Sequence, residues 1–501
     1  MGKQMEYIDY MQLNWLQRLF YKLRRGITNL PGAVGRFFAA IGRWFVRLGR
    51  RTADFLRDIG HAFRDGDWRT RLSFFFMGSG CLFRGQIVKG FVYLAAEILF
   101  FLYFFLFGWH YLQDFNTLGT VEVGEKWNEE LQIFEYTQGD NSMLILLFSV
   151  LTILLAGVFL VLYFASIRAS FRAQRLREEG KRLPSFLDEL RSLRNEKFQI
   201  TLLTVPSAMV TAFTILPILF MILIAFTNFD KNHQPPGNLF TWVGFQNFKD
   251  IFWQDPLKSF TFGKLLGWTL IWAVFATFTN YILGMILALM INKKGIKFKK
   301  FWRTIFIVTI AVPQFVSLLL MSQMLKDQGA ANVLLQELGL IQDPIPFLSD
   351  PTLARITVIA VNMWVGIPYT MLITSGILLN IPEDLYESAK IDGAGPVRTF
   401  FRITLPYMLF VTTPYLITQF VGNINNFNVI FLLSNGGPLT LDYYQAGKTD
   451  LLVTWLYKQT VNDQNYALAA TIGIMVFLIS AVLSLVVYNS SASARKEEEF
   501  S

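Results

Sequence analysis

Long apolar segments constrain this chain more than any other feature of its 501 residues. Each is long enough for the ~20 residues that a helix needs to cross a bilayer, and inside lipid the backbone must satisfy its own hydrogen bonds. The segments span 90–111, 143–167, 203–226, 266–291, 302–322, 356–379, 405–433 and 466–488. The sequence therefore predicts an all-α membrane protein with eight transmembrane helices, and we expect 405–433 to bend near its end.

The charge of the connecting loops predicts the orientation of the spans. Loops 168–197 and 293–303 are rich in Lys and Arg and fall on the same side as the Arg-rich N-terminal region. The alternate loop 120–141 is acidic, with Glu122, Glu125, Glu129, Glu130 and Glu135. Because basic loops remain in the cytoplasm, both termini are expected to be cytoplasmic.

The predicted organisation has four parts. Residues 1–88 form a basic cytoplasmic or interfacial region, 89–200 hold two extra spans and a basic loop, 201–490 hold six spans, and 491–501 form a cytoplasmic tail. Within 72–89 the apolar pattern is broken by glycines and Arg84, which favours a re-entrant or interfacial hairpin over a span.

The N-terminal region also contains an amphipathic pattern between residues 34 and 59. Apolar positions at helical spacing alternate with arginines, and the apolar ones are Phe37, Phe38, Ile41, Trp44, Phe45 and Leu48. This pattern predicts a basic helix that lies on anionic membrane lipid, with a disordered basic tail as the alternative.

Composition excludes several classes of function. The net charge is +9, but the basic residues flank the spans, which argues against nucleic-acid binding. The single Cys81 excludes an internal disulfide, and three dispersed histidines form no metal motif, so no metal or cofactor is expected. Gly447, Lys448 and Thr449 resemble the end of a phosphate-binding loop, but Asp442 stands where that loop requires glycine. No catalytic constellation appears, so we assign no catalytic residues.

A polar segment, residues 381–406, separates the sixth and seventh spans. Pro382 suits the first turn of a helix, Glu383 and Asp384 favour its N-terminal end, and Gly393 ends it after about three turns. A second short helix is expected from Pro396 and to end before Pro406. The segment is too short and polar to span, and its predicted cytoplasmic side makes it a docking surface.

The same segment resembles the loop by which membrane subunits of binding-protein-dependent ABC importers contact their ATPases. The pattern is E-A-A-x3-G-x9-I-x-L-P, and the matching residues here are Glu387, Ala389, Gly393, Ile403, Leu405 and Pro406, with Ser388 in place of the first Ala. We assign ATPase coupling to these residues and to Asp392. Small residues allow close approach, and Glu387 offers a carboxylate to a basic partner residue.

The spans are almost free of charge. Glu97 lies inside the first span, where pairing or snorkelling is expected rather than transport, and spans three to eight have no charged group in their interior. Proton-coupled transporters and ion channels use such groups along their pathways, which disfavours a secondary transporter. The external segments, each about 30 to 40 residues, are too small to form a solute receptor. A separate capture protein is therefore expected.

Neutral polar residues are candidates for solute contact, because amides and aromatic faces suit a polyhydroxyl ligand. Those assigned to substrate binding are Gln314, Asn362, Trp364, Gly366, Tyr369, Asn423 and Asn426. The alternative is that the amides form hydrogen bonds between helices.

Residues 200–490 resemble the larger permease subunit of maltose/maltodextrin importers, the MalF type, through WVGIPYTMLITSGILLNIPEDLYESAKIDGAGP, NINNF and SNGGP. The resemblance implies a bacterial cell-membrane complex with a second permease, an ATPase dimer and an extracytoplasmic sugar-binding protein. The short segment 227–265 departs from the enterobacterial form, which has a large domain there. The prediction is an ATP-driven importer subunit for maltodextrin; the alternatives are another oligosaccharide or polyol, a secondary transporter, or a scaffold or enzyme without solute flux.

Overall fold

In the computed structural model the described residues are 42–43, 46–47, 49–50, 53–55, 57–129, 132–137, 139–293 and 295–490. They fall into two compact units that divide between Gly244 and Phe245. The apolar positions of the predicted amphipathic helix, Phe37, Phe38, Ile41, Trp44, Phe45 and Leu48, lie outside the described residues.

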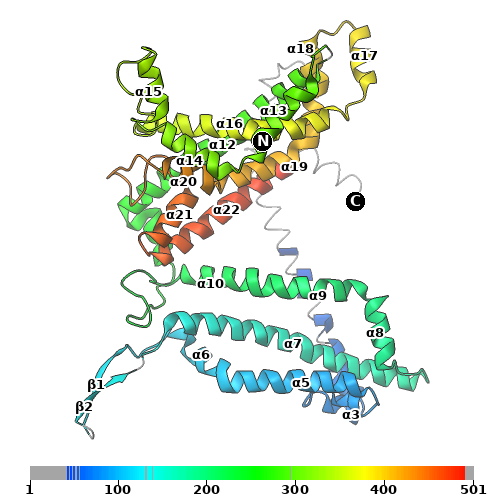
Figure 1. The fold of residues 1–501 in the computed structure, drawn as a ribbon. Coiled ribbons are helices and arrows are strands. Elements are labelled where there is room, and N and C mark those ends of the chain that lie inside the picture. The colour runs from blue at the N-terminus through cyan, green and yellow to red at the C-terminus, as the bar shows by residue number, and fades with distance from the viewer. Residues whose placement is uncertain are drawn as a thin grey trace, which may run out of the picture. The chain divides into compact units, whose positions relative to one another are not determined.

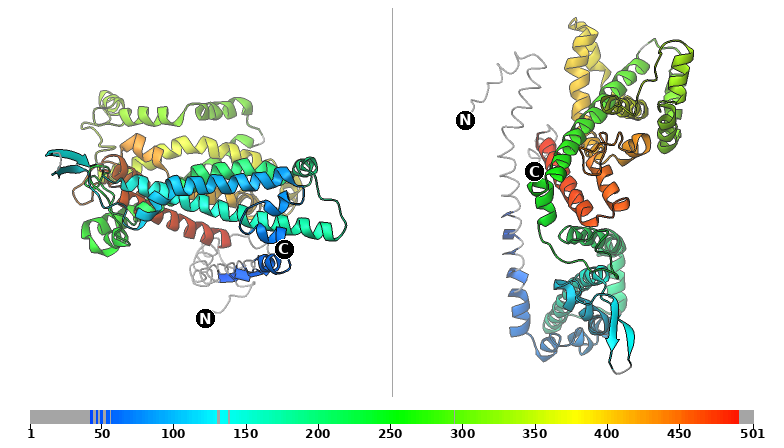
Figure 2. Two further views of the ribbon diagram at one scale, coloured as in Figure 1. Left: turned by 90° about the horizontal axis from the view of Figure 1, so that it is seen from below. Right: turned by 90° about the vertical axis from the view of Figure 1, so that its left-hand side faces the viewer.

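The unit that ends at Gly244 is built from long helices that run side by side, α5, α7 and α9–α10 (Figures 1 and 2). Its elements are α3 (Trp68–Leu72), α4 (Ser79–Leu82), α5 (Ile87–Tyr103), η1 (Phe104–Gly108), α6 (Trp109–Gln113), η2 (Asp114–Asn116), β1 (Gly124–Asn128), β2 (Ile133–Thr137), α7 (Ser142–Glu178), α8 (Phe186–Arg194), α9 (Phe198–Val210), η3 (Thr211–Ile215) and α10 (Leu216–Ile224).

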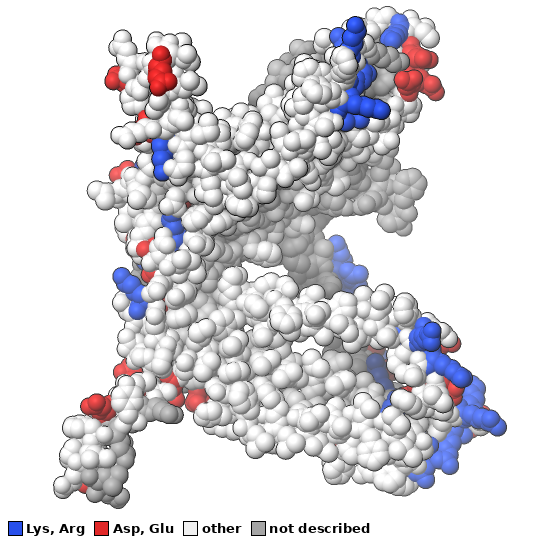
Figure 3. Space-filling view, in the orientation of Figure 1, with Lys and Arg blue, Asp and Glu red and all other residues white. Residues whose placement is uncertain are grey.

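Charge separates the two ends of this unit. Lys and Arg gather where α7 ends and α8 begins, whereas Asp and Glu lie toward the end that carries β1 and β2 (Figure 3). Bilayer-spanning helices place their basic flanks in the cytoplasm, and the cytoplasmic position of this basic end stays a prediction.

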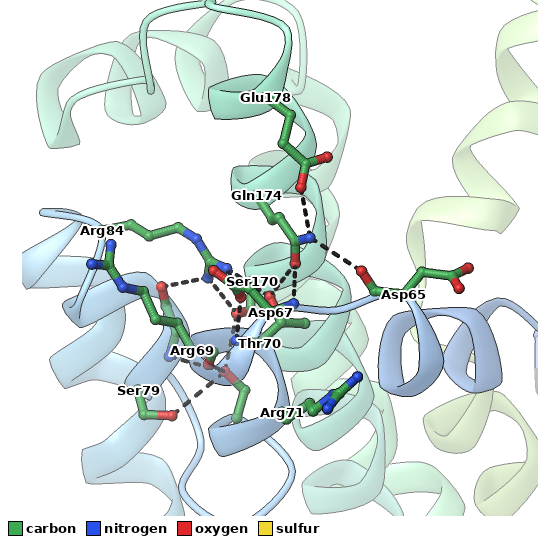
Figure 4. Close-up of polar contacts among 12 residues, drawn as sticks. Asp65, Asp67, Arg69, Thr70, Arg71, Ser79, Arg84, Ser170, Gln174 and Glu178 are labelled. Atoms are coloured by element: carbon green, nitrogen blue, oxygen red, sulfur yellow. Dashed lines mark hydrogen bonds and ion pairs between the residues drawn. The ribbon is translucent and has the colours of Figure 1, made fainter.

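A buried polar network holds the residues before α5 against α7 (Figure 4). The guanidinium of Arg84 donates to the Asp67 carboxylate, to the Thr70 hydroxyl at 2.7 Å and to the Ser170 hydroxyl at 3.0 Å. Burial raises the pKa of Asp67, but hydrogen bonds from Thr70 and the Arg84 charge outweigh burial and lower it overall. Gln174 accepts a hydrogen bond from the Asp67 N–H at 2.9 Å.

This network explains why the stretch 72–89 does not span. Its glycines permit tight turns, and a Cβ on Gly80 would lie 1.8 Å from the Ser170 hydroxyl oxygen. Glu97, buried on α5, accepts a hydrogen bond from the Met77 N–H at 2.8 Å. The expected pairing of Glu97 is thereby confirmed, and its role is to hold this turn.

The unit that begins at Phe245 contains the remaining helices. They are α11 (Gln246–Lys249), η4 (Asp250–Gln254), α12 (Pro256–Asn292), α13 (Lys299–Ala311), α14 (Gln314–Met324), α15 (Ala330–Glu337), α16 (Pro351–Leu378), α17 (Glu383–Ile391), α18 (Pro396–Thr399), η5 (Phe400–Thr404), α19 (Leu405–Ile424), α20 (Phe427–Ser434), α21 (Leu452–Val461) and α22 (Tyr466–Ser490).

Helices α12 and α16 form the centre of this unit, and glycines allow them to approach closely. A Cβ on Gly284 would lie 2.7 Å from the Thr370 Cβ, and one on Gly366 would lie 2.2 Å from the Asn280 amide nitrogen. Elsewhere along the two helices, Trp272 of α12 and Val358 of α16 are fully buried in one core. Small residues at such crossings are typical of membrane helix pairs.

Seven helices in the described part of the chain are long and apolar enough to cross a membrane, or eight if one bent pair counts as a span. That pair is α13 and α14, which meet at an angle of 86° around Val312 and Pro313. The predicted span 405–433 is interrupted near its end, since α19 ends at Ile424 and α20 starts at Phe427. The prediction of a helical membrane protein is confirmed, with a two-stranded sheet as its single described departure.

The loop between α20 and α21 is held by a buried ion pair. The Lys458 ammonium lies 2.6 Å from the Asp450 carboxylate, and the two side chains are 8% and 0% exposed. The carboxylate also accepts a hydrogen bond from the Gly447 N–H at 2.7 Å. Gly447, Lys448 and Thr449 therefore belong to a structural turn and not to a phosphate-binding loop.

Candidate functional site

The polar segment between α16 and α19 folds as α17, a helix with a defined beginning and end. Pro382 is its N-cap and acidic residues occupy its first turn. At its end Gly393 has φ +72°, its N–H donates to the Lys390 carbonyl at 3.0 Å, and the Ala394 N–H donates to the Ala389 carbonyl at 2.8 Å. These two bonds form a Schellman cap, which requires the left-handed conformation that glycine adopts without strain.

The second arm of this segment differs from the prediction. The sequence predicts a separate helix that ends before Pro406. In the structure, α18 continues through the π-helical turn η5 into α19, so that residues 396–424 form one continuous helix. Proline clashes with the carbonyl four residues earlier in a regular helix. A π-helical turn placed just before Pro406 shifts that carbonyl and lets the helix continue.

One face of α17 is anchored to the spans. The Tyr386 hydroxyl lies 3.0 Å from the Thr404 hydroxyl, and Ala389 is buried. Tyr386 and Leu405 pack against a core of buried residues from α12 and α19 that includes Tyr281 and Met408. These contacts connect α17 to the end of η5 and to α19.

The opposite face of α17 is open. Glu387, Ser388, Asp392 and Gly393 are exposed there, and a Cβ on Gly393 would contact no atom within 4 Å. Ile391 beside them is 86% exposed. Among the other residues of the motif, Ile403 and Leu405 are half-buried and Pro406 is exposed. Figure 3 shows acidic side chains on α17 with basic side chains close by. A carboxylate beside exposed apolar residues suits docking of a protein surface.

Among the predicted solute contacts, Asn362 is a buried amide of α16. It is 5% exposed, and its amide nitrogen has no hydrogen-bond partner among the described residues. Asn280 of α12 was not singled out from the sequence, yet its amide oxygen is also buried and without a partner there. Asn280 packs on Gly366, one helical turn from Asn362. An unused donor and an unused acceptor thus lie on facing helices.

Asn423 and Asn426 are engaged inside the chain. The Asn423 amide donates to the Thr277 hydroxyl at 3.0 Å, and the Asn426 amide donates to the Asn423 side-chain oxygen at 3.2 Å. Asn426 also caps α20 through the Val429 N–H at 3.2 Å. These bonds correspond to the alternative role of interhelical contacts.

The remaining predicted contacts lie on open surfaces. Gln314 is exposed at the start of α14, directly after the break, and Gly366 is half-buried against Asn280. Trp364 and Tyr369 on α16 are 51% and 48% exposed. Both aromatic side chains are thus accessible to a ligand or to another subunit.

The fold and the α17 surface define a class: a polytopic helical membrane protein with a capped, exposed helix between two spans. A family described as "Binding-protein-dependent transport system inner membrane component" matches residues 280–496. The chain is 36% identical over 411 residues to the galactooligosaccharides transport system permease protein GanP of Bacillus subtilis, covering 81% of this chain and 94% of that protein.

Two further relatives agree. The chain is 34% identical to the maltodextrin transport system permease protein MdxF of Bacillus subtilis, covering 84% of this chain and 95% of the relative. It is 36% identical to the maltose/maltodextrin transport system permease protein MalF of Escherichia coli, covering 52% and 51%. The protein belongs to the family of binding-protein-dependent transport system inner membrane components.

A solved structure supports the fold. The bacterial alginate ABC transporter in complex with an alginate pentasaccharide-bound periplasmic protein contains a chain that aligns with a TM-score of 0.50 and 22% identity. The alignment covers 60% of this chain and 96% of that chain. The protein therefore has the fold of an ABC importer permease.

Proposed function

We propose that this chain is a translocation subunit of an ATP-driven importer for oligosaccharides, with maltodextrin as the substrate. The observation that carries the proposal is the anchored and exposed helix α17 with Glu387 on its open face. ATP hydrolysis then belongs to a separate ATPase dimer, which docks on α17. A second permease completes the pathway, and an extracytoplasmic binding protein supplies the sugar.

The proposed mechanism follows from the rigid connection between α17 and α19. Closure of the ATPase dimer on ATP displaces α17, and the contact between Tyr386 and Thr404 passes this displacement to α19. The spans then change from an inward-facing to an outward-facing arrangement. Sugar released by the binding protein enters between the spans, and hydrolysis resets the complex.

Substrate choice is supported by the chemistry of the spans and by the relatives. MdxF is named as a maltodextrin permease and GanP as a galactooligosaccharide permease, and both cover most of the chain. Neutral amides and exposed aromatic side chains suit either neutral oligosaccharide.

The test is uptake in liposomes that contain this chain, its partner permease, its ATPase and its binding protein. ATP-dependent uptake of labelled maltotriose in excess over glucose and a galactooligosaccharide is expected. Preferential uptake of the galactooligosaccharide would retain the importer and replace the substrate. Uptake that persists without ATP and disappears with an uncoupler would contradict the importer and favour a secondary transporter.

Asn280 provides a prediction about the solute pathway. A buried polar atom without a hydrogen-bond partner lowers the stability of the fold by about 1–3 kcal/mol. We expect that a sugar hydroxyl forms the missing hydrogen bond with the Asn280 oxygen during transport. Replacing Asn280 by leucine is therefore expected to raise the thermal unfolding midpoint and to lower maltotriose uptake several-fold. Thermal unfolding in detergent and initial uptake rates measure the two effects.

Asn332 offers a matched control, because it is fully buried and its side chain is fully engaged. Its amide nitrogen donates to the carbonyls of Lys326, Asp327 and Ile345, and its oxygen accepts from the Ile345 N–H. Asn332→Leu is expected to lower the unfolding midpoint. A lower midpoint for Asn280→Leu as well would show that Asn280 only holds helices together.

A further inference from the structure

An aromatic hairpin projects from the end of the unit where α6 ends and α7 begins (Figure 1). Strand β1 pairs with β2 in antiparallel register, with Trp127 opposite Phe134 and Glu125 opposite Tyr136. Because side chains alternate between the faces of a strand, these residues share one face. Isolated two-stranded hairpins are marginally stable in water, so contacts at the base of this one contribute to its stability.

The support comes from the base of the hairpin. The Asp140 carboxylate accepts hydrogen bonds from the N–H groups of Thr120 and Val121 at 2.7 and 2.9 Å, and the Asp140 N–H donates to the Val121 carbonyl at 2.7 Å. A Cβ on Gly139 would lie 2.4 Å from the Val123 nitrogen, so only glycine fits there. These contacts hold the hairpin at its base.

The shared face presents large aromatic side chains to solvent. Trp127, Phe134 and Tyr136 are 48%, 62% and 72% exposed, and the rings of Trp127 and Phe134 meet edge to face at 5.0 Å. Large aromatic side chains are typical anchors of protein interfaces. Burial of this face by a partner would remove apolar surface from water.

Charge on the same face identifies the kind of partner. Glu125 is exposed among the rings, and Glu122 and Glu129 are exposed nearby. Placing these carboxylates in the hydrocarbon of the outer leaflet would be costly, which disfavours lipid as the partner of this face. A protein surface with complementary basic residues satisfies both the rings and the carboxylates.

We propose that this face of the hairpin is a docking surface for the extracytoplasmic binding protein of the importer. The proposal rests on the proposed function and on the predicted external position of the acidic loop 120–141. The family depends on a binding protein, and the hairpin supplies aromatic anchors and negative charge that guide such a protein to the permease. On this proposal, the binding protein has a basic surface that contacts the hairpin between α6 and α7.

The experiment uses the complete importer in liposomes and measures ATPase activity against binding-protein concentration. A variant with Trp127, Phe134 and Tyr136 all replaced by alanine is expected to raise the half-saturating concentration at least about tenfold, with the maximal rate nearly unchanged. Ile133→Ala is the control, because Ile133 is exposed on the opposite face. Glu125→Lys is expected to raise the half-saturating concentration most at low salt.

Three results would overturn the proposal. An unchanged half-saturating concentration in the triple variant would remove the hairpin from docking. An equal loss of activity at every binding-protein concentration would assign the hairpin to folding or assembly. A defect found in liposomes but absent in detergent would place the aromatic face against lipid. Failure of the proposed function itself is distinct, because the unmodified complex would then show no stimulation by the binding protein.

Discussion

Replacing Glu387 by lysine is expected to abolish ATP-driven uptake while the protein still inserts and folds. The Glu387 side chain lies on the open face of α17, so its replacement disturbs no buried contact of the chain. In the proposed complex it meets a basic residue of the ATPase. Removal of one partner from such a charge pair costs roughly 2–5 kcal/mol, and charge reversal adds repulsion. At about 1.4 kcal/mol per tenfold change, docking would weaken by well over tenfold.

The measurements are copurification of the ATPase with the permease and uptake in liposomes. Glu337→Lys is the matched control, because Glu337 is an exposed glutamate at the end of α15, outside the predicted docking surface. Normal ATPase copurification and uptake by Glu387→Lys would refute the assignment of α17 as the docking helix.

Substitutions of Gly393 can distinguish two roles of this residue: its left-handed backbone conformation, which ends α17, and its lack of a side chain, which lets the ATPase approach closely. Asparagine tolerates the left-handed conformation better than other residues, and its Cβ would meet no neighbour within the chain. Gly393→Asn is therefore expected to preserve α17 but to weaken ATPase docking, and Gly393→Asp is expected to abolish uptake. Docking that is unaffected by either side chain would show that the partner does not approach Gly393.

Replacing Lys458 by methionine is expected to destabilise the unit that contains α21 by about 3–5 kcal/mol, because a buried carboxylate loses its partner. The Lys458 ammonium bonds both the Asp450 carboxylate and, at 2.9 Å, the Asn435 carbonyl. A thermal melt followed by tryptophan fluorescence reports this loss, since the indole N–H of Trp268 donates to the Thr449 carbonyl at 3.1 Å beside the pair.

A second ion pair supplies the contrast. Lys448 lies 3.1 Å from Asp442, whose side chain is 69% exposed, so Lys448→Met is expected to cost less than about 1 kcal/mol. Adding Asp450→Asn to Lys458→Met removes the unpaired charge and is expected to recover part of the loss. Equal effects of Lys448→Met and Lys458→Met would contradict the importance of burial.

Local signals explain which features the sequence could predict. The spans follow from apolar length, and α17 follows from Pro382, its acidic first turn and Gly393, because each acts within a few residues. The sequence predicts an uninterrupted span over 302–322, whereas α13 and α14 meet at 86° around Pro313, an angle that depends on packing that no local pattern encodes. Pro406 was wrongly expected to separate two helices, because the π-helical turn that accommodates it has no sequence signature.

Partners distant in the chain explain what sequence reasoning missed in the candidate site. Asn280 is one amide inside an apolar run, and its position against Gly366 depends on the register of α12 and α16. Asn423 fits a solute contact by type, but the Thr277 hydroxyl that engages it lies far away in sequence. The sequence therefore identified several polar residues of the spans but missed Asn280, and it did not determine which amides remain unpaired.

The break between α13 and α14 has a consequence for how this protein is made and kept in the cell. The last carbonyl groups of α13 and the N–H groups of Gln314 and Phe315 at the start of α14 lack partners within their own helices, and residues 311–315 are exposed in the isolated chain. Lipid offers no hydrogen bonds to such groups, so another subunit or a water-filled space must supply them. We expect an orphan copy to be recognised by membrane proteases, so that its abundance follows the synthesis of its partner.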